Sequence, residues 1–254
     1  MANGELPAQP LGETAAPHLS LIIPAYNESR RIGFTLEQTQ SYFNTQSYSW
    51  EIIVVDDGST DDTVEVAESA TQNVENIQII RISPNRGKGH ALKVGMLKSN
   101  GQYVGFMDAD YKTDMTCTEE ALERLDAGKD IVIGSRKMSG AQIDVKPRAY
   151  RRIGSLLFNK YIHLLLPILG NYKDTQCGFK FYTQRAAHEI FSRSVIERFM
   201  FDAEALYLAY KLNLTVEEMP VRWSSDHDTR TRIIESIVRN TIDLVRIRHT
   251  HKNI

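Results

Sequence analysis

Short apolar runs alternate with helix-like stretches through the first half of the chain. Runs rich in Val, Ile and Leu predict strands at residues 18–24, 50–55, 77–82, 103–107 and 131–133. The stretches between them predict helices at residues 29–42, 61–71, 89–99 and 118–127, with Asp61 or Asp62 as a helix cap. This alternation is typical of a parallel sheet with right-handed crossovers. We therefore expect an α/β fold in which helices flank a mostly parallel, twisted sheet.

The second half of the chain changes character at a basic loop. An apolar, aromatic helix follows around residues 156–169, then the segment 174–182, another helix, a short strand and a final helix. The final helix carries an apolar stripe that we expect to pack on the core, formed by Ile233, Ile234, Ile237, Val238, Leu244, Val245 and Ile247.

No segment is expected to span a bilayer. The apolar stretch at 156–169 contains polar residues and is shorter than the roughly 20 apolar residues that a transmembrane helix needs. Residues 1–17 have no apolar core and predict a flexible tail rather than a signal peptide. Because Cys117 and Cys177 lie far apart, neither a disulfide framework nor a zinc site is expected, and a reducing compartment fits better.

Composition and charge narrow the class of partner. The chain has 254 residues with 42% hydrophobic and 24% charged residues, and its formal net charge of −2 excludes a general nucleic-acid binder. Basic residues nevertheless gather in two runs, residues 136–152 and 229–254, which flank the second-half apolar stretch. A single such run could be solvated surface, but two of them favour an anionic partner.

Polar clusters follow four of the predicted strands. They read Tyr-Asn-Glu at 26–28, Asp-Asp-Gly-Ser at 56–59, Asn-Arg-Gly-Lys-Gly at 85–89 and Asp-Ala-Asp at 108–110. Ligands of parallel sheets bind beyond the carboxyl ends of the strands, so we expect these four clusters to form one site.

Each cluster suggests a separate part of that site. Alternate residues of an extended segment share a face, so Asp108 and Asp110 can both offer hard oxygen ligands to Mg²⁺ or Mn²⁺. A carboxylate at 56–57 can accept from a ribose hydroxyl or a base N–H, although a cap or an Asx turn explains one of the two aspartates. The loop at 85–89 places two cations before a helix, as a phosphate site would, although a plain turn would keep its glycines; its spacing is not that of a Walker A loop.

These motifs, with Gly-Ser-Arg at 134–136 and Asp-Thr-Gln-Cys-Gly-Phe-Lys at 174–180, occur in the order seen in glycosyltransferase family 2. The similarity runs from about Ser20 to Arg248, and the chain resembles most the dolichyl-phosphate β-glucosyltransferase branch of that family. The resemblance implies a GT-A fold in one domain, residues 18–254. Residues 18–135 would then form the nucleotide-sugar half and residues 136–254 the acceptor-binding half. It also implies inverting transfer of a sugar, glucose from UDP-glucose, to a polyprenyl or dolichyl phosphate.

The resemblance further implies a role for each matching residue. Uridine would be held by Pro24, Tyr26, Glu28 and Asp57. Lys88 would lie near the nucleotide, Asp108 and Asp110 would bind the metal, and a loop carrying Arg230 and Arg232 would close over the diphosphate. The acceptor phosphate would meet Arg136, Arg148 and Arg152. In place of the glutamine that follows the metal motif in some mannose synthases, this chain has Tyr111.

The acceptor decides what catalysis requires. A phosphate monoester is already an anion at neutral pH, so it needs charge neutralisation and in-line positioning more than a strong base. We therefore expect Asp110 and Arg136 to carry the chemistry. Asp174 is the candidate if a base or a sugar anchor is needed, and a cap of the turn before Gly178 is the alternative role for it.

The apolar helix suggests where the reaction takes place. Basic residues lead into Leu156, Leu157, Phe158, Tyr161, Ile162, Leu164, Leu165 and Leu166. Such a helix can lie in a bilayer interface, which predicts C-terminal interfacial helices and a peripheral position on the cytoplasmic face of a membrane. Packing inside the protein or in an oligomer is the alternative.

Other functions remain open at this stage. A transferase of the same fold could use a hydroxyl acceptor or take mannose from GDP-mannose. A nucleotidyltransferase also uses paired aspartates on a parallel sheet. The Asp-Asp-Gly-Ser cluster after the second predicted strand argues against that class of enzyme. A carbohydrate-binding module would not need the converging cations.

Overall fold

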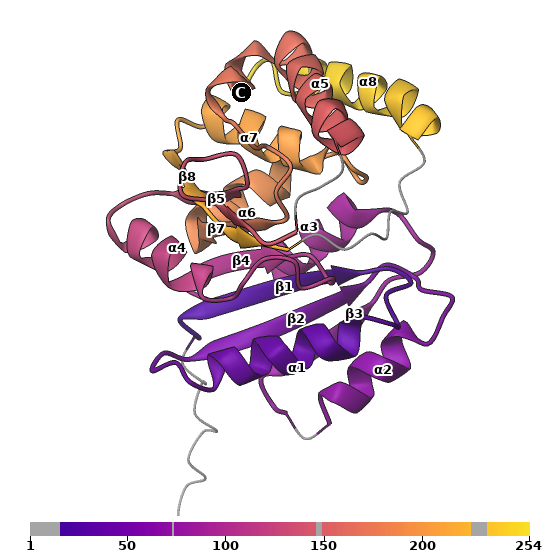
Figure 1. Ribbon diagram of the computed structural model, residues 1–254, viewed down its shortest axis with the longest axis vertical. Coiled ribbons are helices and arrows are strands. Elements are labelled where there is room, and N and C mark those ends of the chain that lie inside the picture. The colour runs from indigo at the N-terminus through magenta and orange to yellow at the C-terminus, as the bar shows by residue number, and fades with distance from the viewer. Residues whose placement is uncertain (1–15, 73, 146–148, 225–232) are drawn as a thin grey trace, which may run out of the picture.

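The structure is a computed structural model, and it describes residues 16–72, 74–145, 149–224 and 233–254 (Figure 1). A seven-stranded sheet has the order β3-β2-β1-β4-β7-β5-β8. Its strands are β1 (Leu19–Ala25), β2 (Trp50–Asp56), β3 (Ile77–Arg81), β4 (Tyr103–Met107), β5 (Ile131–Ser135), β7 (Phe179–Thr183) and β8 (Val216–Pro220). Strand β7 runs antiparallel to β4 and β5, and the other neighbours pair in parallel, which confirms the predicted α/β class.

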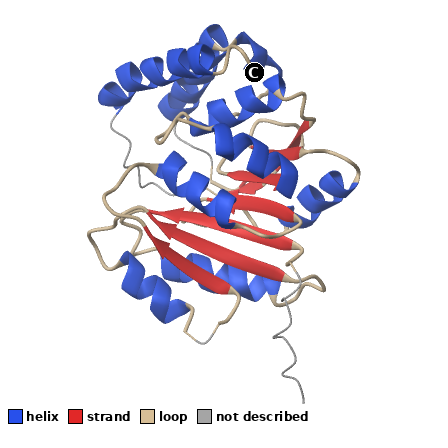
Figure 2. Cartoon of the chain, turned by 180° about the vertical axis from the view of Figure 1, so that it is seen from behind, coloured by secondary structure: helices blue, strands red, loops and turns tan. Residues whose placement is uncertain are grey.

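Helices cover both faces of this sheet, as Figure 2 shows. They are α1 (Ile32–Phe43), α2 (Thr63–Ala70), α3 (Lys88–Lys98), α4 (Cys117–Asp126), α5 (Ala149–Leu165), α6 (Gln184–Arg193), α7 (Phe201–Lys211) and α8 (Ile233–Thr250), with a 3-10 helix η1 at Pro167–Asn171. A short ribbon of β6 (Gln142–Ile143) and β9 (Arg222–Trp223) lies apart from the main sheet.

The strands alternate their side chains between two hydrophobic cores. In β1, Leu21 and Ile23 join the core under α1, α2 and α4, whereas Ile22 joins the core under α3, α6 and α7. Burial of both faces explains why these strands read as continuous apolar runs in the sequence. The carboxyl ends of β1, β2 and β4 meet at one edge of the sheet, and the predicted site lies there.

The largest departure from the expected order of elements is β7. Sequence analysis predicted no element for the segment 174–182, but Phe179–Thr183 forms a buried strand between β4 and β5. Residues 136–254 therefore complete the sheet that residues 18–135 begin. The assignment of donor and acceptor roles to these two segments stays a prediction.

Helices α5 and α8 lie side by side at the end of the molecule farthest from α1 and α2 (Figure 1), and the Tyr161 hydroxyl of α5 bonds the Thr241 hydroxyl of α8. The expectation that the α8 stripe packs on the core is correct for Leu244 and Ile247, which are buried. It is wrong for Val238 and Val245, which are 67% and 56% exposed. The side chains of residues 233–237 lie outside the described part of the chain.

The apolar residues of α5 divide in the same way. Ile162 and Leu166, just past its end, are buried, whereas Leu156, Leu157 and Leu164 are exposed. Among the described residues, no helix is both long and apolar enough to cross a membrane.

Candidate active site

The loops after β1 and β2 are joined by hydrogen bonds. Asn27, with a positive φ of 54°, accepts from the Thr60 amide through Oδ1 at 2.8 Å, and its own amide donates to Ser59 Oγ at 2.9 Å. The Glu28 amide donates to Thr63 Oγ1 at 2.8 Å. Three residues predicted to hold uridine lie along this edge: Pro24 is buried in β1, Tyr26 is exposed, and Glu28 forms an ion pair with Arg31 at 3.0 Å.

Asp57 shapes the glycine-rich loop that follows β3. Its buried carboxylate accepts from the amides of Arg86 at 3.0 Å and Gly87 at 2.6 Å, and from the Asn85 side chain at 2.8 Å. In this way one carboxylate fixes the backbone of the predicted phosphate loop. A direct contact of Asp57 with uridine stays a prediction.

In the neighbouring Asp56, one carboxylate oxygen accepts a hydrogen bond and the other does not. Its Oδ2 accepts from the Ser59 amide at 3.1 Å, while its Oδ1 is buried and has no hydrogen-bond partner among the residues described. Sequence analysis assigned the nucleotide to Asp57 by resemblance. The sequence pattern left both aspartates open for a ribose or base contact, and the open oxygen favours Asp56 for it.

The same loop packs closely against residues 196–198. Gly87 has a φ of 120°, and a Cβ there would lie 2.5 Å from the Glu197 carbonyl oxygen. A Cβ at Gly89 would lie 2.5 Å from the Ile196 carbonyl oxygen, so both glycines are needed for this approach. The His90 amide donates to the Glu197 carbonyl at 2.9 Å.

A buried glutamate in α7 holds this supporting segment in place. Glu204 accepts from the amides of Val195 and Ile196, both at 2.9 Å. It also bonds the ring of His251, which follows α8, at 2.8 Å. The position of the phosphate loop therefore depends on α7 and α8. Sequence analysis did not identify Glu204, because these partners come together only in the folded chain.

Asp108 and Asp110 line one cavity of about 100 Å³, although residues 109–110 form a turn and not the extended segment from which a shared face was expected. Met107, Lys112, Thr113, Arg136, Gly178 and Trp223 also line it. Lys88 forms an ion pair with Asp108, and Lys112 Nζ lies 2.6 Å from Asp110 Oδ2. Burial opposes the charged form of Lys88, but Asp108 and Asp202 outweigh it and raise the pKa of Lys88.

This pair of carboxylates fits a divalent cation. Oδ1 of Asp110 is buried and accepts no hydrogen bond from any described residue, so it is available as a ligand. Cations already lie against both carboxylates, which shows that the site favours positive charge. The described part of the chain contains no cluster of three or more His, Cys, Asp and Glu side chains that could hold a metal. The remaining ligands would have to come from diphosphate and water.

Gly178 determines how Asp108 is oriented. A Cβ at Gly178 would overlap the Asp108 carboxylate, and the Asp108 amide donates to the Gly178 carbonyl at 3.1 Å. The segment at 174–180 is therefore part of the metal-site wall. Its resemblance to a family motif was visible in the sequence, but this contact was not.

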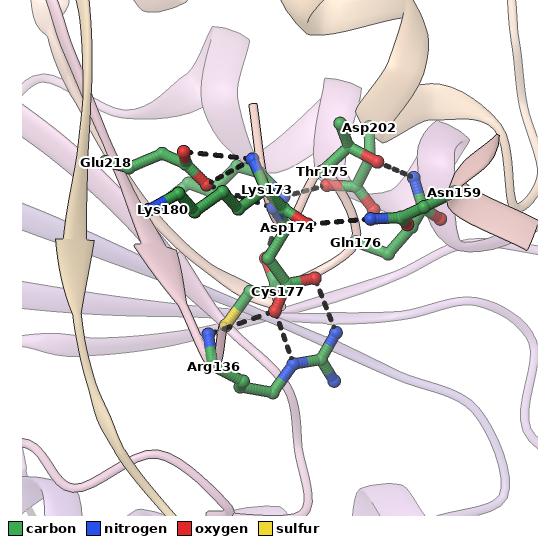
Figure 3. A network of polar contacts seen from close by, with 10 residues as sticks. All are labelled: Arg136, Asn159, Lys173, Asp174, Thr175, Gln176, Cys177, Lys180, Asp202 and Glu218. Carbon is green, nitrogen blue, oxygen red and sulfur yellow. Dashed lines mark hydrogen bonds and ion pairs between the residues drawn. The ribbon is translucent and has the colours of Figure 1, made fainter. Parts of the chain in front are cut away.

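Arg136 is held by Asp174, as Figure 3 shows. The guanidinium donates through Nε to Oδ2 at 2.7 Å and through Nη2 to Oδ1 at 2.9 Å, and the Arg136 amide donates to Oδ2 at 3.0 Å. The guanidinium carbon also lies 5.4 Å from the centre of the Trp223 ring. The side chain of Arg136 is thus fixed at the wall of the cavity.

The same pairing argues against Asp174 as a general base. Burial alone would raise the pKa of Asp174, but the hydrogen bonds and charge of Arg136, aided by Lys137, lower it. Burial likewise opposes the charge on Arg136, whose pKa is nevertheless raised by Asp174. A fully buried carboxylate with both oxygens bound to an arginine is a positioning group, which favours the structural role that was left open for Asp174.

The turn that carries Asp174 is itself bound on several sides (Figure 3). Glu218 accepts from the amides of Lys173 and Asp174 at 3.0 Å, and the Asn159 side chain of α5 donates to the Lys173 carbonyl at 2.7 Å. Lys180, fully buried in β7, donates to the Cys177 carbonyl at 2.7 Å and pairs with Asp202 of α7. Sequence analysis assigned no role to Lys180 or Asp202, although a lysine between two phenylalanines was a signal.

Several predicted site residues lie outside the described residues. These are Arg148, Arg230 and Arg232, and Arg152 is described only as part of the α5 backbone. Their proposed contacts with acceptor phosphate and diphosphate stay predictions.

Comparison with known proteins places this geometry in a family. The model of the family described as "Glycosyl transferase family 2" matches residues 20–191. A dolichyl-phosphate beta-glucosyltransferase of Dictyostelium discoideum is 36% identical over 242 residues, which cover 91% of this chain and 74% of the relative. The chain belongs to glycosyl transferase family 2. Family membership confirms the resemblance found in the sequence and makes the protein a glycosyltransferase.

Two further relatives of this family 2 glycosyltransferase carry the same name. The protein of Saccharomyces cerevisiae is 34% identical over 250 residues, with 91% of this chain and 74% of the relative covered. The human protein is 32% identical over 239 residues, with 88% and 72% covered.

Solved structures confirm the GT-A fold. Glucosyl-3-phosphoglycerate synthase from Mycobacterium tuberculosis, in complex with Mn²⁺, UDP and glucosyl-3-phosphoglycerate, superimposes with a TM-score of 0.67. The match covers 93% of this chain and 80% of that one at 18% sequence identity. The same enzyme with Mg²⁺ and UDP gives a TM-score of 0.68 at 17% identity, over 93% and 80% of the two chains.

Proposed function

We propose that this family 2 member transfers glucose from UDP-glucose to a dolichyl or polyprenyl phosphate, with inversion at the sugar carbon. The observation that carries the proposal is a cavity with two carboxylates on one wall and the anchored Arg136 on another. Such a cavity suits a diphosphate on one side and a second phosphate on the other. The names of the relatives, dolichyl-phosphate beta-glucosyltransferases, support the same sugar and acceptor.

On the donor side, Asp108 and Asp110 would hold Mg²⁺ or Mn²⁺, as the complexes of structural neighbours with these ions and UDP suggest. When bound, the ion neutralises the diphosphate and makes it a better leaving group. The chain itself would supply Lys88, which follows the loop whose Arg86 and Gly87 amides are bound by Asp57. Pro24, Tyr26 and Glu28 line the strand end where uridine would lie.

On the acceptor side, Arg136 would bind the phosphate whose oxygen attacks the sugar. Two of its guanidinium nitrogens bind Asp174, and the planar group keeps further N–H donors for an oxyanion. A phosphate monoester carries its own negative charge, so its attack needs no strong base. The lowered pKa of Asp174 agrees with this, because that carboxylate stays ionised and oriented toward arginine.

A lipid acceptor requires a surface that meets the membrane. Helices α5 and α8 expose Leu156, Leu157, Leu164, Val238, Ile242 and Val245. Exposed basic residues border this apolar face, namely Lys160, Arg239 and Arg246. Apolar side chains bordered by cations favour peripheral binding to an anionic bilayer.

A donor and acceptor screen tests the proposal. Purified protein with Mn²⁺ would be given UDP-glucose or GDP-mannose together with a short polyprenyl phosphate or a water-soluble alcohol. We expect release of UDP that depends on the polyprenyl phosphate. Faster turnover of GDP-mannose would assign the mannosyl branch, and equal transfer to alcohols would replace the lipid acceptor with a hydroxyl acceptor.

A further inference from the structure

Two basic nitrogens, one on the residue after Arg136 and one on α5, are buried without a hydrogen-bond partner among the described residues. Lys137 follows Arg136 in the turn after β5, and its Nζ is shielded from solvent. His163 belongs to α5, and its Nε2 is shielded in the same way. Neither atom has a partner within the described ranges of the chain.

Both groups lie where α5 meets the turn that carries Asp174. Asn159, one helical turn before His163, donates to the Lys173 carbonyl at 2.7 Å, so this side of α5 faces the turn. The His163 ring also bonds the backbone of Tyr172. Burial, followed by the charge of Lys137, lowers the pKa of His163, which is consistent with two neighbouring basic groups.

The carboxylates near Lys137 already accept hydrogen bonds from other groups. Asp174 binds the Arg136 guanidinium with both oxygens, and Glu218 accepts from the amides of Lys173 and Asp174. Burial is the largest influence on Lys137 and lowers its pKa, although Asp174 and Glu218 act in the opposite direction. The ammonium therefore lies close to negative charge without a hydrogen bond to it.

Such an arrangement is costly unless a ligand completes it. A buried polar group without a partner loses the hydrogen bonds that it made to water. An anion would offer acceptors to the Lys137 ammonium, and to His163 Nε2 when that ring is protonated, because the other ring nitrogen already bonds the Tyr172 backbone. Phosphate matches this requirement, because its oxygens form charge-assisted hydrogen bonds with lysine, histidine and arginine.

We propose that Lys137 and His163 form, together with Arg136, the binding site for the phosphate of the acceptor. This inference rests on the proposed function, and it adds two residues that neither the motifs nor the relatives' names indicate. The next residue, Leu164, lies about 100° further round α5 and is exposed. A polyprenyl chain could thus lie against the outer face of α5 while its phosphate reaches the inner face.

Kinetics with a short polyprenyl phosphate test the role of Lys137. In Lys137→Met we expect the KM for the acceptor to rise at least about tenfold, as loss of one charge-assisted bond would predict, with the KM for UDP-glucose unchanged. Lys137→Arg should recover most of the affinity. His163→Gln should raise the KM for the acceptor by a smaller factor. The double variant should raise this KM by less than the product of the two single factors, because the two side chains bind the same phosphate. Lys98→Met, an exposed lysine at the end of α3, is the matched control.

Inorganic phosphate separates this site from the proposed function. It should inhibit wild type in competition with the acceptor, and it should raise the melting temperature of wild type more than that of Lys137→Met. If wild type fails to use polyprenyl phosphate but keeps this phosphate-dependent stabilisation, the function is wrong and the anion site stands. If Lys137→Met alters only the KM for UDP-glucose, or binds phosphate as wild type does, the site is refuted. If wild type uses polyprenyl phosphate and Lys137→Met loses the phosphate-dependent stabilisation but keeps the wild-type KM for the acceptor, the anion bound there is not the acceptor's phosphate and the proposal is refuted.

Discussion

The proposed donor side and the proposed acceptor side of this molecule are built in different ways. On the donor side, strand ends and glycine turns are tied together by short hydrogen bonds, such as those from Asp57 to the loop at 85–87. On the acceptor side, Lys137 and His163 are buried without partners, and α5 and α8 expose apolar residues. The buried atoms left without partners among the described residues also differ: they are carboxylate oxygens of Asp56 and Asp110 on the donor side, which suit a cation or a donor group, and basic nitrogens on the acceptor side, which suit an anion. Changes on the donor side should therefore affect chemistry most, and changes at the apolar face should affect it least.

The largest effect is expected at the metal site. Asp110→Asn, or removal of metal with EDTA, should lower transfer by a factor on the order of 100 or more, because the diphosphate charge is no longer neutralised. The fold should survive, since Asp110 lies on the surface of a cavity and not in the core. Asp62→Asn is the matched control, because that exposed aspartate makes no side-chain cap. Full activity in EDTA would exclude a metal-dependent mechanism.

The wall of the same site provides the second test. Gly178→Ala should lower transfer by roughly tenfold or more, because the added Cβ overlaps the Asp108 carboxylate and must displace it. The apparent affinity for Mn²⁺ should fall with it. At Gly170 a Cβ would meet nothing within 4 Å, so Gly170→Ala should behave as wild type. Equal activity of the two variants would show that the position of Asp108 does not matter.

Sequence patterns predict the donor side better than the acceptor side for a physical reason. Strands and helices of the first half obey local periodicities, and the strand from Tyr103 to Met107 was predicted residue for residue. The common location of the polar clusters could also be predicted, because parallel strands place their carboxyl ends at one edge of the sheet. These are properties of neighbouring residues, which a sequence displays directly.

The acceptor side depends on contacts between distant segments. Arg136 and Asp174 are 38 residues apart, and β7 is recognisable as a strand only once β4 and β5 lie beside it. The apolar run on α5 did not reveal which side faces outward. Leu166 is buried and Leu164 is exposed because neighbouring helices fix the rotation of α5. Such features need the tertiary structure.

Asp174→Asn tests the link between the two sides. Loss of the carboxylate leaves the Arg136 charge uncompensated next to the cavity, so we expect unfolding to become easier by about 3–5 kcal/mol. Transfer should fall by about tenfold, mainly through a higher KM for the acceptor phosphate. The pH dependence gives a second readout. Because the pKa of Asp174 is lowered in the native state, its stabilisation is present above its unfolded pKa, near 4, and is lost as pH falls through the native pKa.

Urea unfolding between about pH 7 and pH 3 measures this contribution. Wild type should lose stability at the acid end, and Asp174→Asn should lose less over the same range, because the group that titrates is absent. If transfer persists in Asp174→Asn with an unchanged KM for the acceptor, Asp174 does not position Arg136. A loss of kcat alone, with a new basic limb in its pH profile, would instead support a role as general base.

The smallest effect on chemistry is expected at the apolar face. Leu157→Glu/Leu164→Glu changes two exposed residues of α5, so the fold and the transfer to a short, water-soluble polyprenyl phosphate should change less than about twofold. Flotation with anionic liposomes should nevertheless be lost, because each leucine contributes about 1.5–3 kcal/mol when it leaves water. Leu166 is unsuitable for this test, since it is buried. Wild type that stays unbound to such liposomes would refute the membrane face. A change from dimer to monomer in sedimentation would assign the face to contact between subunits.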